Sequence, residues 1–251
     1  MYRNLDAEKI VETVRLLRSR IQERFPEAGL GRVAESLLGI AEKADANARA
    51  ISRPFLPLRI GMAVLVAAFL ALLGWIFLHL KISAQVDRFS ELFQGVDAAL
   101  NTVLLVGGAI FFLFTLEVRT KRNRALKLIH ELRSLAHIVD MHQLTKDPET
   151  ILGNGPRTAS SPKRSMTRFE LSRYLDYCSE MSSLIGKIAA LYVQDYDDSV
   201  VLGAVDQIED LTASLSRKAW QKIMINNQLS DEPVSAWRKG PTHAPPADGA
   251  D

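Results

Sequence analysis

Two long apolar stretches constrain the fold of this chain more than any other feature. Residues 60–80 read IGMAVLVAAFLALLGWIFLHL and residues 98–116 read AALNTVLLVGGAIFFLFTL, and neither stretch contains Asp, Glu, Lys or Arg. A helix of about 20 apolar residues spans the ~30 Å hydrocarbon core of a bilayer, because it rises ~1.5 Å per residue. The sequence therefore predicts two transmembrane helices, at about 60–80 and 98–116, joined by an outer loop over 81–97.

The lysines and arginines around these stretches predict their orientation. The arginines that precede the first stretch are Arg49, Arg53 and Arg59. The basic cluster that follows the second stretch consists of Arg119, Lys121, Arg122, Arg124 and Lys127. The connecting loop holds only Lys81 and Arg88. By the positive-inside rule, both termini lie in the cytoplasm, and the basic cluster is an orientation signal that contacts lipid headgroups.

The overall charge and the cysteine content exclude some classes of protein. The formal net charge is only +2, so no strong electrostatic field favours a nucleic-acid partner. The single cysteine, Cys178, cannot form an internal disulfide. An unpaired cysteine is consistent with the reducing cytoplasm.

The rest of the sequence predicts amphipathic α-helices and shows no alternating strand pattern. The buried face of one expected helix carries Leu171, Tyr174, Cys178, Met181, Ile185, Ile188 and Tyr192. Positions three and four apart form such a seam in a helical bundle. We therefore expect an all-α fold, in which a two-helix transmembrane hairpin carries a cytoplasmic antiparallel helical bundle formed by the N- and C-terminal segments.

These patterns divide the chain into four parts. We expect an N-terminal cytoplasmic helical pair over 1–57, the transmembrane hairpin over 58–117, a cytoplasmic helical bundle over 118–226 and a polar, proline-rich disordered tail over 227–251. Prolines 54 and 57 should break the chain before the first span.

The second span shows no stop signal at its inner end, since residues 109–146 contain no Gly or Pro. We expect one continuous helix from about Ala98 to Leu144. Its cytoplasmic half should bury Leu128, Leu132, Leu135 and Val139. Small residues of the first span should pack against Gly107 and Gly108 of the second, because small side chains let helices approach closely in lipid; they are Ala63, Ala67, Ala71 and Gly74.

Chemistry is most concentrated in residues 130–148, HELRSLAHIVDMHQLTKDP. The candidate catalytic residues there are His130, Glu131, Arg133, His137, Asp140 and His142. An acid–base site would need His137 and Asp140 to converge with a carboxylate of the 167–192 helix, namely Glu170, Asp176 or Glu180. No nucleophile motif or phosphate-binding loop supports such a site. The alternative is a polar helix face that pairs with a neighbouring helix or docks a protein.

The same segment does not predict a metal site. His130 and His137 are seven residues apart, which places them ~10.5 Å apart along a helix axis. One zinc ion with bonds of ~2.1 Å does not bridge that distance. We therefore assign no metal and no cofactor.

Several phrases of the sequence resemble a family of uncharacterised bacterial inner-membrane proteins with two spans. The phrases are HELRSLAHIVDMHQLTKDP, FELSRYLDYCSEM, RFPEAGLGRVAESLL and RPFLPLRIG. The resemblance extends over most of the chain from the first helix to Trp220. It implies a location in the bacterial cytoplasmic membrane, and it brings no activity, ligand or partner with it.

Three functions remain open at this stage. The first is a membrane-anchored, non-catalytic interaction, scaffold or regulatory module whose cytoplasmic bundle binds a protein partner or a second copy. The alternative is a membrane-tethered enzyme that uses the His130–His142 face. The second alternative is an oligomeric transport or pore subunit, although ion paths usually carry charged residues and neither span has one.

Overall fold

The computed structural model describes residues 4–79, 89–148, 159–160 and 166–231. Over these residues the chain is helical and contains no strand. The helices are α1 (Ala7–Arg24), α2 (Gly29–Ser52), α3 (Leu56–His79), α4 (Phe89–Leu144), α6 (Arg168–Val193) and α7 (Ser199–Asp231). The all-α class predicted from the sequence is confirmed.

Side-chain caps fix where several helices begin. The Asp6 carboxylate accepts hydrogen bonds from the amides of Glu8 and Lys9 at the start of α1. Thr167 and Glu170 form a capping box at the start of α6. Asp198 accepts from the amides of Val200 and Val201 in the first turn of α7. Each cap satisfies amides that the helix itself leaves without an acceptor.

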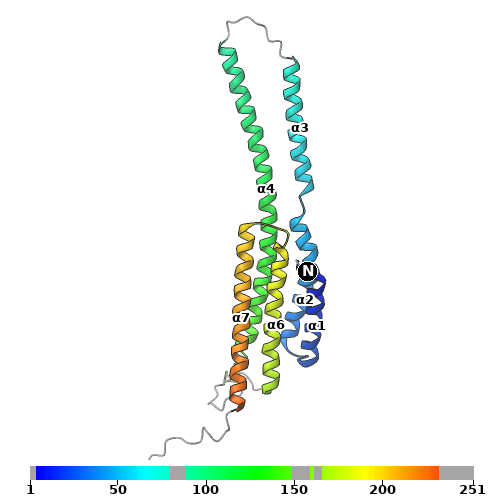
Figure 1. The fold of residues 1–251 in the computed structure, drawn as a ribbon, viewed down its shortest axis with the longest axis vertical. Helices are drawn as coiled ribbons and strands as arrows, with labels where there is room; N and C mark the ends of the chain where they lie inside the picture. The colour runs from blue at the N-terminus through cyan, green and yellow to red at the C-terminus, as the bar shows by residue number, and fades with distance from the viewer. Residues whose placement is uncertain (1–3, 80–88, 149–158, 161–165, 232–251) are drawn as a thin grey trace, which may run out of the picture.

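Helix α6 is the centre of the packed region, which we define as α1, α2, α6, α7 and residues 117–144 of α4. It contacts α1, α2, α4 and α7, and Figure 1 shows these helices side by side. All members of the seam expected on this helix are buried, namely Leu171, Tyr174, Cys178, Met181, Ile185, Ile188 and Tyr192. Helix α4 buries Leu132, Leu135 and Val139 as expected, whereas Leu128 is half-buried. This burial stabilises helices that would be marginal alone in water.

Helix α3 and residues 89–116 of α4 extend beyond the packed region (Figure 1), and we call them the apolar arms. The described residues contain two helical stretches that are long and apolar enough to cross a membrane, Gly29–Trp75 and Gly95–Leu144. The most apolar window of each stretch has 0% of its residues buried. Large side chains such as Leu104, Leu105 and Phe111 are exposed along the arms.

The boundaries of α3 and α4 differ from the predicted ones. Helix α4 already begins at Phe89, so residues 89–97 of the expected outer loop are helical. The apolar spacing of Phe89, Phe93 and Val96 continues the helix of the second span rather than a separate element. Proline 57 lies in the first turn of α3, where a missing amide costs no helical hydrogen bond. Residues 80–88 lie outside the described residues.

The expected packing of small residues between the two arms is wrong. A Cβ atom placed on Gly74, Gly107 or Gly108 would meet nothing within 4 Å. The arms are joined near the packed region and separate with distance from it (Figure 1), so these glycines face no neighbouring helix.

The helical part of the C-terminus is longer than predicted. Helix α7 runs to Asp231, and residues 227–231 of the expected disordered tail are therefore helical. Asn226 anchors this end, because its Nδ2 donates to the carbonyl of Arg168 and to Ser172 Oγ at 2.9 and 2.6 Å. Residues 232–251 of the expected tail lie outside the described residues.

Candidate functional site

The candidate catalytic residues do not form one site on α4. His130, Glu131 and His137 are exposed, and Arg133 and Asp140 are half-buried. Nη2 of Arg133 donates to Oε1 of Gln207 on α7 at 2.6 Å. Within the described part of the chain, no group of three or more His, Cys, Asp or Glu side chains could hold a metal ion.

The carboxylates that an acid–base site would need are engaged elsewhere. Glu180 pairs with Arg20, and Asp176 pairs with Arg173. The Glu170 carboxylate accepts from the amide of Thr167 at 2.7 Å in its capping box. The structure therefore ties these side chains to α1 or to their own helix, and gives none of them a contact with His137.

His142 differs from the other candidate histidines because its ring is hydrogen-bonded to a side chain of another helix. Its Nδ1 lies 3.0 Å from the hydroxyl of Tyr174 on α6, a hydrogen-bonding distance. Burial lowers the pKa of His142 below its usual value, and the positive charges of Lys146 and Arg32 lower it further. His142 is therefore a neutral, half-buried side chain at pH 7.

The basic cluster after the second apolar stretch is divided between structural and exposed residues. Lys121 Nζ lies 3.1 Å from Oε1 of Glu117, and Nη2 of Arg122 lies 2.9 Å from Oδ2 of Asp198. Arg119, Arg124 and Lys127 are exposed. Lys121 therefore pairs within α4, Arg122 links α4 to the start of α7, and the other three residues remain on the surface.

Sequence reasoning missed Glu117, which joins the two arms. The side chain is only 8% exposed, and Oε1 accepts from the amide of Phe55 at 3.2 Å. Nε of Arg59 in the first turns of α3 donates to Oε2 at 3.4 Å. The available signal was its position, because Glu117 is the first charged residue after the apolar stretch and has Lys121 four residues later.

A groove of about 750 Å³ with an apolar lining lies between α1, α6 and α7. Its apolar lining comes from all three helices: Leu5 and Ile10 at α1, Leu184 on α6, and Trp220 on α7. Trp220 is 56% exposed, which is high for so large an apolar side chain. We call this feature the α1–α6–α7 groove.

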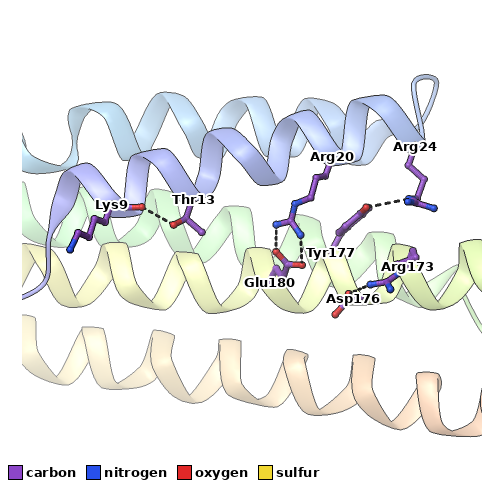
Figure 2. A network of polar contacts seen from close by, with 8 residues as sticks. All are labelled: Lys9, Thr13, Arg20, Arg24, Arg173, Asp176, Tyr177 and Glu180. Carbon is purple, nitrogen blue, oxygen red and sulfur yellow. Dashed lines mark hydrogen bonds and ion pairs between the residues drawn. The ribbon is translucent and has the colours of Figure 1, made fainter.

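Charges around the groove are paired with one another (Figure 2). Arg20 of α1 reaches Glu180 of α6 through two bonds, with Nη1–Oε1 at 3.1 Å and Nη2–Oε2 at 2.5 Å. Asp176 accepts from Arg173 at 3.1 Å on the same helix. These ion pairs neutralise part of the rim, so the groove offers a ligand mainly its apolar lining together with the charge of Lys187.

The one cysteine does not provide a reactive group. Cys178 is fully buried on the core side of α6, and burial raises the pKa of its thiol to about 12. A thiol of that pKa stays protonated at pH 7 and is a weak nucleophile. This result agrees with a packing role for Cys178.

Comparisons with family models, with curated proteins and with solved structures gave no match to this chain.

The sequence did not indicate the groove. Its residues are spread over three helices, and their proximity depends on how α1 and α7 lie against α6. The local signal was weak: Trp220 is a large aromatic side chain that lies outside the apolar stripe of its helix, and it is 56% exposed.

Proposed function

We propose that the chain is a membrane-anchored, non-catalytic interaction module of a bacterial inner membrane. In this proposal the two apolar arms form a transmembrane hairpin, and the packed region lies on the cytoplasmic side. The absence of charge from the two apolar stretches supports the first point. The excess of arginine and lysine before the first stretch and after the second supports the second point. The resemblance to two-span bacterial proteins supports the bacterial inner membrane.

The observation that carries an interaction function is the α1–α6–α7 groove. Helices α1 and α7 both pack on α6 and leave a strip of α6 between them uncovered among the described residues. The strip extends from Asp176 to Lys187, about 16 Å at the usual helical rise. An amphipathic helix of a partner protein fits such a strip, because its apolar side chains at i, i+4 and i+7 would follow the groove.

Trp220 is the expected anchor of this contact. Exposed tryptophans in apolar depressions frequently contribute most to the affinity of an interface. The surrounding ion pairs, Arg20–Glu180 and Arg173–Asp176, would form a polar rim that orients the partner without opposing it. We therefore assign the groove to a helical segment of a different protein.

The first test is crosslinking in cells. A photoreactive benzoylphenylalanine replaces Trp220 in the full chain, and a matched variant carries it at Ile138, which is 43% exposed on α4 outside the groove. We expect a discrete adduct from position 220 that is missing from position 138. Equal adducts from both positions, or none from position 220, would contradict the assignment.

The second test uses the partner identified by that adduct in purified form. Trp220→Ala in the full chain should weaken its binding at least about tenfold, or ~1.4 kcal/mol, whereas Ile138→Ala should leave it unchanged. An adduct between two copies of this chain would mean that the groove binds a second copy rather than a different protein. Unchanged binding by Trp220→Ala would refute the groove as the binding site.

The two alternatives have less support. The acid–base hypothesis required a convergence of His137 with carboxylates that are instead paired with Arg20, Arg173 and Thr167. A pore would need polar or charged side chains facing a path across the membrane, and neither apolar stretch contains a charged residue.

A further inference from the structure

A second cavity lies at the end of the packed region that is remote from the apolar arms. It has a volume of about 480 Å³, is open to solvent, and is bordered by the turn between α1 and α2, the C-terminal end of α4 and the first half of α6. In Figure 1 this turn and the end of α4 lie opposite the end from which the arms emerge. The cavity shares no lining residue with the α1–α6–α7 groove.

Positive charge exceeds negative charge at this cavity. Arg24 and Lys146 line it, and Arg32 stands close by, with Nη2 3.8 Å from the position of a Cβ on Gly29. Among the described residues, none of these three cations lies within ion-pair distance of a carboxylate. Glu27 is the single acidic residue of the described lining.

The cations are held in place by aromatic rings rather than by acids. Nζ of Lys146 lies 5.2 Å from the ring centre of Tyr174. The guanidinium of Arg24 lies 5.2 Å from the ring centre of Phe169, and its Nε donates to the hydroxyl of Tyr177 at 3.3 Å. Such contacts position a cation but do not neutralise its charge, so both groups can still bind an anion.

The N-terminus of α2 adds to the positive electrostatic potential at the cavity. Gly29 begins α2 and lines the cavity, and the N-cap residue Ala28 has no side chain that could accept from the first amides. The ring of His142 fills the space beside Gly29, since a Cβ there would lie 2.9 Å from Cε1 of His142. The positive end of the α2 dipole therefore opens next to the cations and His142.

We propose that this cavity binds a small oxyanion, a phosphate or carboxylate group. Lys146 and Arg24 in the lining and the neighbouring Arg32 contact the anionic group. The volume is in the range of known small-molecule sites. The site is independent of the membrane anchor and of the groove, and its remoteness from the arms favours a soluble ligand over a lipid headgroup.

His142 provides a built-in reporter of occupancy. Lys146 and Arg32 act on its ring charge, so an anion bound between them would offset their effect and raise the pKa of His142. The hydroxyl of Tyr174 stays protonated, because burial raises its pKa well above the usual value. The imidazole therefore senses the anion while its hydrogen-bond partner keeps its charge state.

The test is a histidine NMR titration of the full chain in lipid nanodiscs. Inorganic phosphate, phenyl phosphate and benzoate are added separately, on the order of 10 mM each, enough to saturate a site of millimolar Kd. We expect the His142 resonances to shift saturably and its pKa to rise by about half a unit or more. The exposed His130 and His137 in the same spectra should not follow that curve.

Matched variants decide whether the cavity is responsible. Lys146→Gln and Arg32→Gln should each weaken the apparent affinity at least about fivefold, and the exposed Lys127→Gln should not. Tighter binding of phenyl phosphate than of benzoate identifies a phosphate site, and the reverse identifies a carboxylate site. If His142 does not respond to any probe, or responds equally in all three variants, the proposal is refuted. Trp220→Ala should leave this titration unchanged, which separates it from the groove.

Discussion

Helix α4 contains two regions that differ in where their apolar side chains point. Between Gly95 and Leu116 they cover the whole circumference, and large ones such as Leu104 are 78% exposed. Beyond Glu117 they form one stripe, in which Leu132 and Val139 are fully buried against neighbouring helices. The change happens within one uninterrupted helix. A helix that is apolar all round is covered either by lipid or by other protein on every side, whereas a striped helix requires a neighbour on one side only.

The largest expected effect is a difference in stability between a substitution in the packed region and one in an apolar arm. Leu132→Ala should lower the free energy of unfolding of the packed region by about 2–5 kcal/mol, because Leu132 is fully buried and its truncation leaves a cavity in the core. Leu104→Ala, on the arm, should change it by less than about 0.5 kcal/mol. Denaturation of the full chain in detergent, followed by circular dichroism, measures both. Equal losses would mean that the arm also packs against protein.

The next effect concerns the ion pair between α4 and the start of α7. Asp198→Ala removes both the partner of Arg122 and the cap on α7, and should cost about 1–2 kcal/mol. Asp198→Asn keeps a capping oxygen and should cost less. Similar losses for the two variants would show that the charge, and not the cap, carries the contribution.

The lowered pKa of Asp198 predicts that the stability of the fold depends on pH. Burial raises its pKa, but hydrogen bonds from Arg122, Val201 and Val200 outweigh that effect and lower it. Since the folded pKa lies below the unfolded value of about 3.9, its contribution is complete above pH ~4 and is lost as the pH falls through the folded pKa. Acid denaturation of Asp198→Asn should therefore show a weaker loss of stability below pH ~4 than the unchanged chain. Parallel curves would contradict this assignment.

A smaller effect should appear at the junction between the regions. Glu117→Ala removes the acceptor of the Phe55 amide and the partner of Arg59 and Lys121. We expect hydrogen exchange of the Phe55 amide to accelerate about tenfold, with little change in the amides of α6. Acceleration throughout α6 would show that Glu117 supports the packed region itself rather than its link to α3.

The smallest effect is expected at His142. Its folded pKa is lower than the unfolded value of about 6.5, so protonation favours the unfolded state. The unchanged chain should lose less than about 1 kcal/mol of stability as the pH falls from ~7 through the folded pKa, and His142→Gln should not. A stability that rises over this interval would mean that a negative charge dominates near the ring.

The sequence predicted most of the fold because helix signals are local. The seam from Leu171 to Tyr192 lies within one helix and was predicted from its spacing alone. The helix ends at Phe89 and Asp231 differ from the predicted ones, because the change from apolar to polar composition that set the predicted ends does not end a helix. The small-residue packing of the arms failed, because spacing indicates that two helices can approach and not that they do.

The functional sites were harder to predict than the fold. His142 belongs to a cluster of histidines in the sequence, yet its partner Tyr174 comes from another helix 32 residues later. The groove and the cationic cavity each combine residues from three or more helices. Only the relative placement of these helices brings such side chains together, and periodicity along one helix contains no information about it.

The proposed function requires that the arms cross a membrane and that the packed region lie on its cytoplasmic side. The direct measurement is cysteine labelling with a membrane-impermeant maleimide in intact bacteria, in a chain whose buried Cys178 is replaced by serine. A cysteine at position 95, near the start of α4, should be labelled in intact cells, and one at the exposed position 137 only after lysis. Labelling of position 137 in intact cells, or of neither position in the membrane fraction, would contradict the account.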